Sequence, residues 1–475
     1  MRIRATKDLF AWDALEDSPS IRTLRDALAA IPDGPLLDGL RRARGKGRAD
    51  LPGAVLWGVL VLTILLRHTS FDACLAELAR NADRRRLIGI ASEQAVPRPW
   101  DFSRFLEVLG EEPHRSRLRA TFDAMARRLG LAVPDLGQDT AGDATGRNAR
   151  AHAHPDQVAE EVAQGLPQPS GGRKEYTDEE GRVVRVVEWF GYKLHLLADV
   201  KHEVTLAYRI SDTKAGDNEV LPELVAQARG NLPAGRLQTL AYDQAADDAD
   251  VQAVLHDAGI KPLIQNRALW KEGPERPPPG GRYPLHLVHD EAGTVFRYGR
   301  VSDPPVRHQM AYMGYEKDRD TIKYRCPARH EGWDCPSDAR CNGGQAYGLA
   351  VRIPSELDLR RFPPVPRATR QFERRYKGRT AVERVNARFK IYWGADDGNL
   401  RGARRFHAFV GAILVAHLSL ATLLASAPRW EGRLGTMRLS PSAQALRATL
   451  EQPEPPAERA ADAEAADPAA VTVGV

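Results

Sequence analysis

The stretch 376–390, YKGRTAVERVNARFK, combines a phenol, two cations and a carboxylate. Read as a helix at about 100° per residue, it places these four polar side chains within roughly 60° of one another. The four are Tyr376, Arg379, Glu383 and Lys390. Apolar side chains form a stripe on the other side of this predicted helix. A carboxylate suits a metal ion and the cations suit phosphate oxygens, whereas the plain alternative is the solvated face of an amphipathic helix.

Two more carboxylates lie near predicted strand ends, where the functional groups of α/β sheets are usually found. Asp243 ends the apolar stretch LQTLAYD, and Asp139 lies in LGQDTAGDATG, which could close the first strand of the same layer. Three converging carboxylates repel one another unless cations neutralise them, and Mg²⁺ takes such oxygen ligands. Asp135 and Asp143 compete with Asp139 for the first position. An Asp at a strand end is also a common turn former or helix cap.

Length and charge set the broad class of protein. The chain has 475 residues, 43% of them hydrophobic, which predicts a folded protein of two to four domains. A net charge of +5 and a pI near 9.0 are compatible with an anionic partner. Arg and Lys crowd residues 360–405, whereas the segment after Glu451 is acidic and rich in Ala and Pro.

The expected compartment is the cytoplasm. The N-terminal residues contain no apolar signal segment, and four cysteines in so long a chain indicate a reducing environment. The apolar runs 54–66 and 408–427 are predicted to be buried core helices rather than membrane spans, because the first is too short and the second carries His417.

Strand and helix patterns alternate in the middle of the chain. Strands are predicted at 183–199, 204–212, 237–243 and 261–266, with a helix at 218–229. Such alternation indicates an α/β layer with some parallel pairing. The flanking segments differ, and they divide the chain as follows: a helical N-terminal domain at 1–130, a core at 131–270, a β-leaning insertion at 271–365, the second part of the core at 366–430 and a disordered tail at 431–475.

The spacing Y-x₂-R-x₃-E-x₆-K resembles the signature of DDE transposases from bacterial insertion sequences. Three other stretches resemble the same family: WFGYKLHLLAD, LAYDQAADDADVQAVLHDAGIKPLIQN and LRGARRFHAFVGAILVAHL. The resemblance implies an α/β fold with a ribonuclease-H-like catalytic core. It also implies that the helical N-terminal domain binds DNA ends and that a β-rich insertion precedes the last catalytic carboxylate.

The resemblance also implies roles for individual residues. Asp139, Asp243 and Glu383 would be the catalytic residues and would bind two Mg²⁺ or Mn²⁺ ions, which activate a water or hydroxyl for phosphodiester displacement. Three residues would contact DNA phosphates: Tyr376, Arg379 and Lys390.

The implied function is transposition of DNA. The protein would bind the terminal inverted repeats of its element as a homodimer, cleave phosphodiester bonds and transfer the 3′-OH strand to target double-stranded DNA. One alternative is a catalytically decayed transposase that acts as a DNA-binding regulator. Another is a ribonuclease-H-like nuclease that acts on other nucleic acids without strand transfer.

The cysteines of the insertion offer a second metal hypothesis. A closed tetrahedral Zn²⁺ site could form from four residues: Cys326, His330, Cys335 and Cys341. Their spacing is not that of a C-x₂-C knuckle, and the alternative is three reduced cysteines beside a surface histidine.

Overall fold

The computed structural model describes most of the chain between residues 19 and 451. The described residues are 19–44, 51–178, 180, 182–267, 269–271, 273–280, 283–284, 286–299, 301, 303–396, 400–427, 432–435 and 451. The predicted disordered tail, 431–475, lies almost entirely outside them.

The described N-terminal residues are helical, as the sequence predicts. The α-helices are α1 (Pro19–Ala29), α2 (Gly34–Arg44), α3 (Gly53–Leu65), α4 (Phe71–Arg80), α5 (Ala82–Leu87), α6 (Pro99–Gly110) and α7 (His114–Ala132), with a 3₁₀ turn η2 (Glu93–Ala95). Helix α3 is buried from Val55 onward, which confirms that the short apolar run is a core helix.

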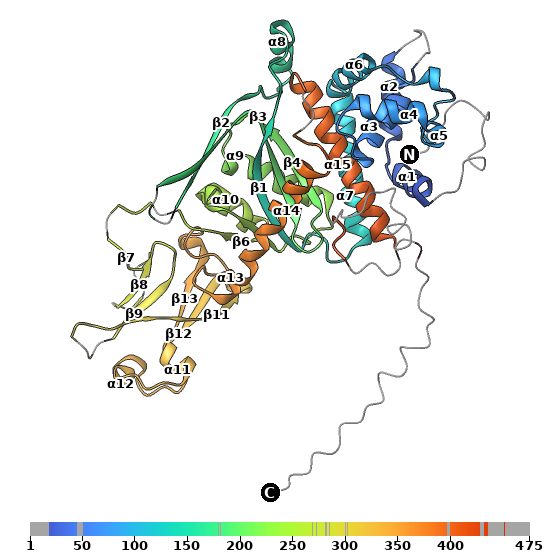
Figure 1. Cartoon of the computed structure of the whole chain (residues 1–475). Coiled ribbons are helices and arrows are strands. Elements are labelled where there is room, and N and C mark those ends of the chain that lie inside the picture. Colours follow the sequence, from blue (N-terminus) through green and yellow to red (C-terminus); the bar gives the residue numbers. More distant parts are fainter. Residues whose placement is uncertain are drawn as a thin grey trace, which may run out of the picture.

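A six-stranded mixed sheet forms the centre of the molecule (Figure 1). Its strands are β1 (Asp139–Asn148), β2 (Ser170–Thr177), β3 (Val183–Asp199), β4 (Thr205–Ser211), β5 (Thr239–Tyr242) and β6 (Lys261–Ile264). The order is β2-β3-β1-β5-β6, with β4 also paired to β3. Strand β3 is antiparallel to its neighbours, whereas β1, β5 and β6 run parallel. The fold is therefore mixed α/β, as predicted.

The first strand begins at Asp139, although the sequence placed a strand end there. Strand β1 contains two glycines, Gly142 and Gly146, which weaken a strand signal in the sequence. Each glycine faces a large aromatic ring: a Cβ on Gly142 would overlap Tyr242, and one on Gly146 would lie 2.5 Å from Trp189. The glycines therefore make room for aromatic residues of neighbouring strands.

Four further helices lie between and after the strands of the sheet in the chain; three of them pack on the sheet, and the last also packs on the N-terminal helices. They are α8 (Pro155–Ala163), α9 (Asp217–Asn231), α10 (Ala249–Asp257) and α15 (Ala403–Ala425), with a 3₁₀ turn η3 (Gln244–Ala246). Within the described part of the chain, α15 alone is long and apolar enough to cross a membrane, but 83% of its most apolar window is buried inside the protein. It packs against α3, α6 and α7, so it is a core helix as predicted.

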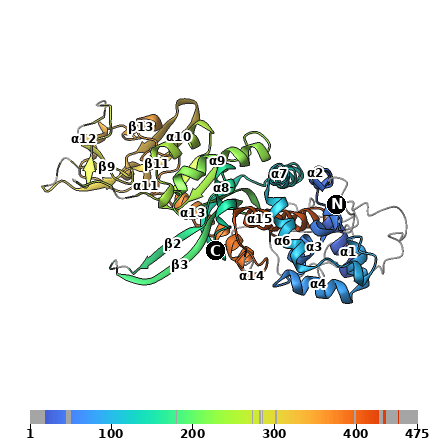
Figure 2. The ribbon, with the colours of Figure 1, turned by 90° about the horizontal axis from the view of Figure 1, so that it is seen from above.

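The insertion forms a body with its own small core. Its strands are β7 (Glu275–Arg276), β8 (Leu287–Asp290), β9 (Val295–Tyr298), β10 (Arg307–Gln309), β11 (Ala311–Glu316), β12 (Thr321–Arg325) and β13 (Ala350–Pro354). Its helical segments are η4 (Lys317–Arg319), α11 (Pro327–Glu331), α12 (Asp338–Asn342) and η5 (Ser355–Leu357). The buried apolar residues of this region form a separate cluster, whereas the N-terminal helices share one continuous core with the sheet and α15. Figure 2 shows the insertion and the N-terminal helices at opposite ends of the molecule, with the β2–β3 hairpin projecting between them.

The chain between the insertion and α15 is helical but not one helix. It consists of α13 (Arg370–Tyr376), a 3₁₀ turn η6 (Lys377–Arg379) and α14 (Thr380–Ile391). Gly378 in the turn lies against Val200, whose Cγ1 would be 2.8 Å from an added Cβ. The single helix predicted for 376–390 is therefore interrupted at the point where the backbone approaches the end of β3.

A buried carboxylate fastens α14 to the sheet. Glu203, in the turn between β3 and β4, has no exposed side-chain surface. It pairs with Arg384 at 2.6 Å, with Arg433 at 2.5 Å and also with Arg388. Arg384 and Arg388 are one helical turn apart on α14, so one carboxylate sets the rotation of this helix on the sheet.

Replacing Gly142 with Ala tests the close packing in β1. The new methyl group would collide with the buried Tyr242 ring, so we expect a loss of about 1–3 kcal/mol in the free energy of unfolding. Urea denaturation measures it. Gly171→Ala in β2 is the matched control, because nothing lies within 4 Å of its added Cβ. Equal stability of the two variants would contradict the packing argument.

Candidate active site

The parallel register of β1 and β5 brings two aspartates to the same end of the sheet. Ala141 pairs with Ala241, so the positions two residues further along are Asp143 and Asp243. Asp243 follows the last residue of β5 and accepts a hydrogen bond from the Ala245 amide at 2.9 Å, capping the turn η3. Asp243 therefore caps the turn η3 and still lies beside Asp143, so it can serve both the turn and the site.

The carboxyl group of Asp143 lies in a strongly perturbed environment. Burial raises its pKa to about 6; the nearby charge of Asp243 adds to this effect and the Arg379 guanidinium opposes it. The Asn386 side-chain amide on α14 donates a hydrogen bond to Asp143 at 3.3 Å. Asp143 is thus the point where β1, β5 and α14 meet.

Asp139 does not lie with Asp243. It is the first residue of β1, four positions before Asp143 on the same face, which corresponds to about 13 Å along the strand. Its carboxylate accepts a hydrogen bond from the Thr239 hydroxyl at 2.6 Å, at the start of β5. The predicted position of Asp139 at a strand end is therefore corrected: it begins the strand.

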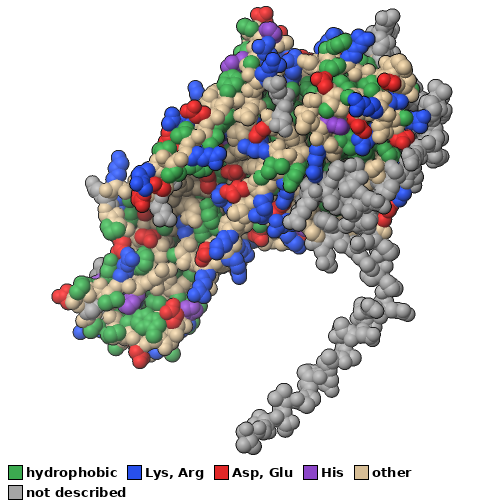
Figure 3. All heavy atoms as spheres, viewed as in Figure 1, with side chains coloured by type: hydrophobic (Ala, Val, Ile, Leu, Met, Phe, Trp, Pro, Cys, Tyr) green, Lys and Arg blue, Asp and Glu red, His purple; other side chains and the backbone are tan. Residues whose placement is uncertain are grey.

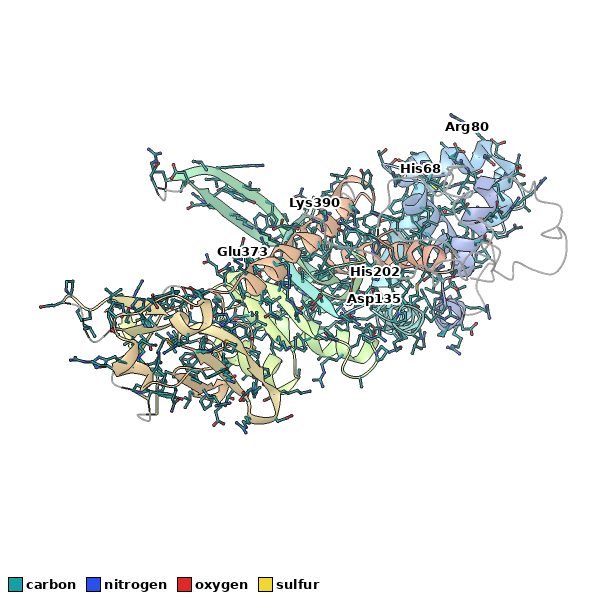
Figure 4. The ribbon with its side chains drawn as sticks, turned by 90° about the horizontal axis from the view of Figure 1, so that it is seen from below. His68, Arg80, Asp135, His202, Glu373 and Lys390 are labelled. Atoms are coloured by element: carbon teal, nitrogen blue, oxygen red, sulfur yellow. The ribbon has the colours of Figure 1, made fainter. Side chains whose placement is uncertain are left out.

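Asp135 forms its hydrogen bond and ion pair in another part of the molecule. It accepts a hydrogen bond from His202 at 2.9 Å and pairs with Lys201, in the turn after β3. Burial works against ionisation of Asp135, but the bonds from Lys201 and His202 outweigh it and hold the pKa at about 2. Figure 4 shows Asp135 beside His202, away from Glu373 on α13. Of the three candidates, the geometry brings only Asp143 to Asp243.

Two of the predicted polar residues on η6 and α14 lie in contact, and a third is close. Arg379 forms an ion pair with Glu383 at 2.6 Å. The Arg379 guanidinium lies 6.0 Å from the centre of the Tyr376 ring, which stacks on Phe372. Burial raises the pKa of the Tyr376 phenol; the charge of Arg379 opposes this effect, while the charge of Asp243 adds to it. Tyr376, Arg379 and Glu383 therefore belong to the same electrostatic environment as the two aspartates.

Lys390 occupies a different place from the other three. It lies two turns beyond Glu383 and pairs with Asp396 at 3.5 Å. Asp396 also pairs with Arg147, a fully buried residue of β1. Figure 4 shows Lys390 further along the helical segment from Glu373.

Asn386 and Arg147 connect these two places, and neither was predicted from the sequence. Asn386 accepts a hydrogen bond from Arg147 at 3.3 Å and donates one to Asp143. It therefore joins the carboxylates to the pair formed by Arg147 and Asp396. Its spacing of three residues from Glu383 was a signal that both lie on one side of α14. Figure 3 shows Asp and Glu side chains gathered in a hollowed part of this face, with Lys and Arg side chains along the adjoining edge.

No metal site is preformed in the described residues. No group of three or more His, Cys, Asp or Glu side chains there is arranged to hold an ion.

The zinc hypothesis for the insertion can be compared with the positions of its four predicted ligands. Cys326, Cys335 and Cys341 line one cavity of about 30 Å³, but His330 lies outside it, exposed at the end of α11. The structure thus does not bring the four predicted zinc ligands together.

Comparison with known proteins identifies the family. A family model described as the transposase DDE domain matches residues 153–419. This range is more than half of the chain, so the protein belongs to the transposase DDE-domain family. The matched range contains Asp243 and Glu383 but begins after Asp143.

Other comparisons add little. No curated protein matches the chain. A cryo-EM structure of a piggyBac transposase synaptic complex with hairpin DNA is similar at 13% identity, over 92% of this chain and 82% of that chain. The TM-score is 0.34, and this likeness carries no argument here.

The raised pKa of Asp143 predicts how stability depends on pH. Because the folded protein favours the neutral carboxyl, its contribution to stability is present below pH 4 and is lost as the pH rises through about 6. In Asp143→Asn the side chain cannot ionise, so the variant does not lose this stability as the pH rises. We expect the variant to gain about 2 kcal/mol relative to the wild type between pH 4 and pH 8. Urea denaturation in EDTA measures this difference, and a stability difference that does not change with pH would contradict the environment described for Asp143.

Proposed function

We propose that the protein is a DNA transposase whose catalytic carboxylates are Asp143, Asp243 and Glu383, with Asp143 replacing Asp139 in the predicted triad. The main support is that Asp143, inside β1, and Asp243, directly after its parallel neighbour β5, lie close to each other and next to the helix that carries Glu383. Family membership supports transposition as the overall activity.

The strand order supports a ribonuclease-H-like core. Three neighbouring strands, β4, β3 and β1, are antiparallel, and β5 and β6 continue the sheet parallel to β1. The first two carboxylates then come from the central strand β1 and from the end of its parallel neighbour. The third comes from a helix after the insertion, as the resemblance to bacterial insertion-sequence transposases implies.

The donor chemistry fits a divalent cation such as Mg²⁺ or Mn²⁺. All three side chains offer carboxylate oxygens; burial together with the charge of Asp243 raises the pKa of Asp143, and a bound cation would relieve the repulsion between the two carboxylates. Glu383 pairs with Arg379 and would have to leave this partner to become a ligand. Bound cations would supply an activated water or hydroxyl and would stabilise the leaving oxygen.

The surrounding residues suit DNA strands. The guanidinium of Arg379 can hold a phosphate once Glu383 turns to a cation, and the phenol of Tyr376 can donate to a phosphate oxygen. Lys390, which pairs with Asp396, extends the cationic edge along α14. In this proposal the helices of region 1–130 recognise terminal inverted repeats, and two copies of the protein bridge two ends in the cytoplasm.

Substitution of the carboxylates tests the proposal most directly. We expect Asp143→Asn, Asp243→Asn and Glu383→Gln each to reduce Mg²⁺-dependent strand cleavage by at least about 100-fold, because each removes a ligand of the reacting ions. DNA carrying the flanking inverted repeats is the substrate, and binding to it should persist.

Asp139→Asn is the matched control for these variants. It removes a carboxylate on the same face of the same strand and should retain most of the cleavage. Loss of cleavage in Asp139→Asn but not in Asp143→Asn would reverse the assignment. Binding without cleavage by the wild type under any divalent ion would favour the regulator instead. Cleavage without strand transfer or end preference would favour a general nuclease.

Arg379→Ala separates a phosphate contact from a structural role. Because the side chain is partly exposed and faces the carboxylates, we expect cleavage to fall roughly 10–100-fold while the melting temperature changes little. Arg374→Ala, at an exposed position of α13, is the control for removing a cation. A large loss of thermal stability in Arg379→Ala would mean that Arg379 is structural.

A further inference from the structure

A large cavity lies away from the proposed catalytic carboxylates, between the N-terminal helices and the C-terminal end of α14. Its volume is about 670 Å³, within the range of small-molecule sites. Its walls come from α3, α4 and α6 on one side and from the end of α14 and the start of α15 on the other. None of the three proposed catalytic carboxylates lines it.

The interior of this cavity is aromatic. Phe71 and Phe102 stack with ring centres 5.2 Å apart, and Phe409 meets Phe71 edge to face at 6.2 Å. Tyr392, the residue after α14, closes the opposite wall. Phe102 and Phe409 are buried behind Phe71, so the partly exposed rings of Phe71 and Tyr392 are the surfaces that suit a planar ring of a ligand.

The lining is also strongly cationic. Four arginines line the cavity, and Asp72 is the single acid among its described lining residues. The four are Arg67, Arg150, Arg401 and Arg405. Arg405 pairs with Glu107 at 3.1 Å. His68 contributes a ring whose Nε2 is buried and has no hydrogen-bond partner among the described residues.

Arg67 holds its position at a cost in backbone energy. It follows the C-cap of α3 with φ = 57°, in the left-handed region where glycine is the usual residue. The His68 amide donates to the Thr63 carbonyl at 3.0 Å, which completes the helix end. Glycine would serve this turn better, so the side chain is the reason for an arginine here. Its guanidinium lies over the Tyr392 ring at 4.6 Å.

We propose that this cavity binds a single unpaired nucleotide, with the base against the aromatic walls and the phosphate at the arginines. A planar apolar group carrying an anion is the chemistry that such a lining recognises. The source is DNA, a step that rests on the proposed function. Tyr392 is nine residues after Glu383, or about 14 Å along a helix, so an unpaired strand held at the carboxylates reaches the cavity.

Anisotropy of labelled DNA with the full chain tests the proposal. The two probes are a blunt duplex and the same duplex with a short unpaired extension. We expect the wild type to bind the extended duplex roughly tenfold more tightly. Arg67→Gly should abolish this preference, leave affinity for the blunt duplex nearly unchanged and keep or raise the melting temperature, because glycine relieves the left-handed backbone.

Arg229→Ala is the matched control. Arg229 is exposed near the end of α9 and does not line the cavity, so its variant should keep the preference. DNA as the source of the nucleotide is overturned if the wild type shows no preference, and the cavity as the binding site is overturned if Arg67→Gly retains the preference. If both variants lose the preference for the extended duplex equally, net charge alone explains the effect and the proposal is also overturned.

A second experiment identifies the source of the nucleotide. Thermal-shift titration with deoxyadenosine monophosphate reports on the cavity without DNA. Stabilisation of the wild type but not of Arg67→Gly, with no preference for extended DNA, would keep the nucleotide site and overturn DNA as its source. If the protein cleaves no DNA at all, the proposed function fails, while this titration still decides whether the cavity takes a nucleotide.

Discussion

The buried charge cluster around Glu203 is the interaction on which the geometry of the site depends. A carboxylate with no exposed surface pairs with Arg384 and Arg388 of α14 and with Arg433. Uncompensated burial of such a charge would cost several kcal/mol, so the cluster tolerates little displacement of the helix. With one face of α14 held against the turn after β3, the side that carries Asn386 is directed to the middle of β1, where Asn386 donates a hydrogen bond to Asp143.

The electrostatic repulsion between Asp143 and Asp243 is only partly compensated. Asp143 and Asp243 approach each other, and burial and mutual repulsion together raise the pKa of Asp143. Arg379 opposes the effect but is also engaged by Glu383. Asn386 supplies a hydrogen bond and no charge. Such a site stores unfavourable electrostatic energy that a divalent cation and a phosphate would relieve, and this explains why carboxylates and cations occur together on an otherwise ordinary amphipathic helix.

Much of the fold was predictable from local patterns. Strand β3 begins and ends at the predicted residues, because β-branched and aromatic residues dominate it. The N-terminal helices and the buried helix α15 follow from their apolar periodicity. Strand β1 was not predictable in the same way, because Gly142 and Gly146 serve the rings of Tyr242 and Trp189. Their role depends on neighbours distant in sequence, so no local pattern contains it.

By itself, the sequence determined the class of elements, the spacing of Tyr376, Arg379 and Glu383, and the position of Asp243 at a strand end, since these depend on neighbouring residues only. Tertiary structure decided which aspartate of β1 meets Asp243. The parallel register selects Asp143, while Asp139 and Asp135 bind Thr239 and Lys201. The physical reason is that strand register arises from pairing between distant segments, and a shift of four residues moves a carboxylate by about 13 Å.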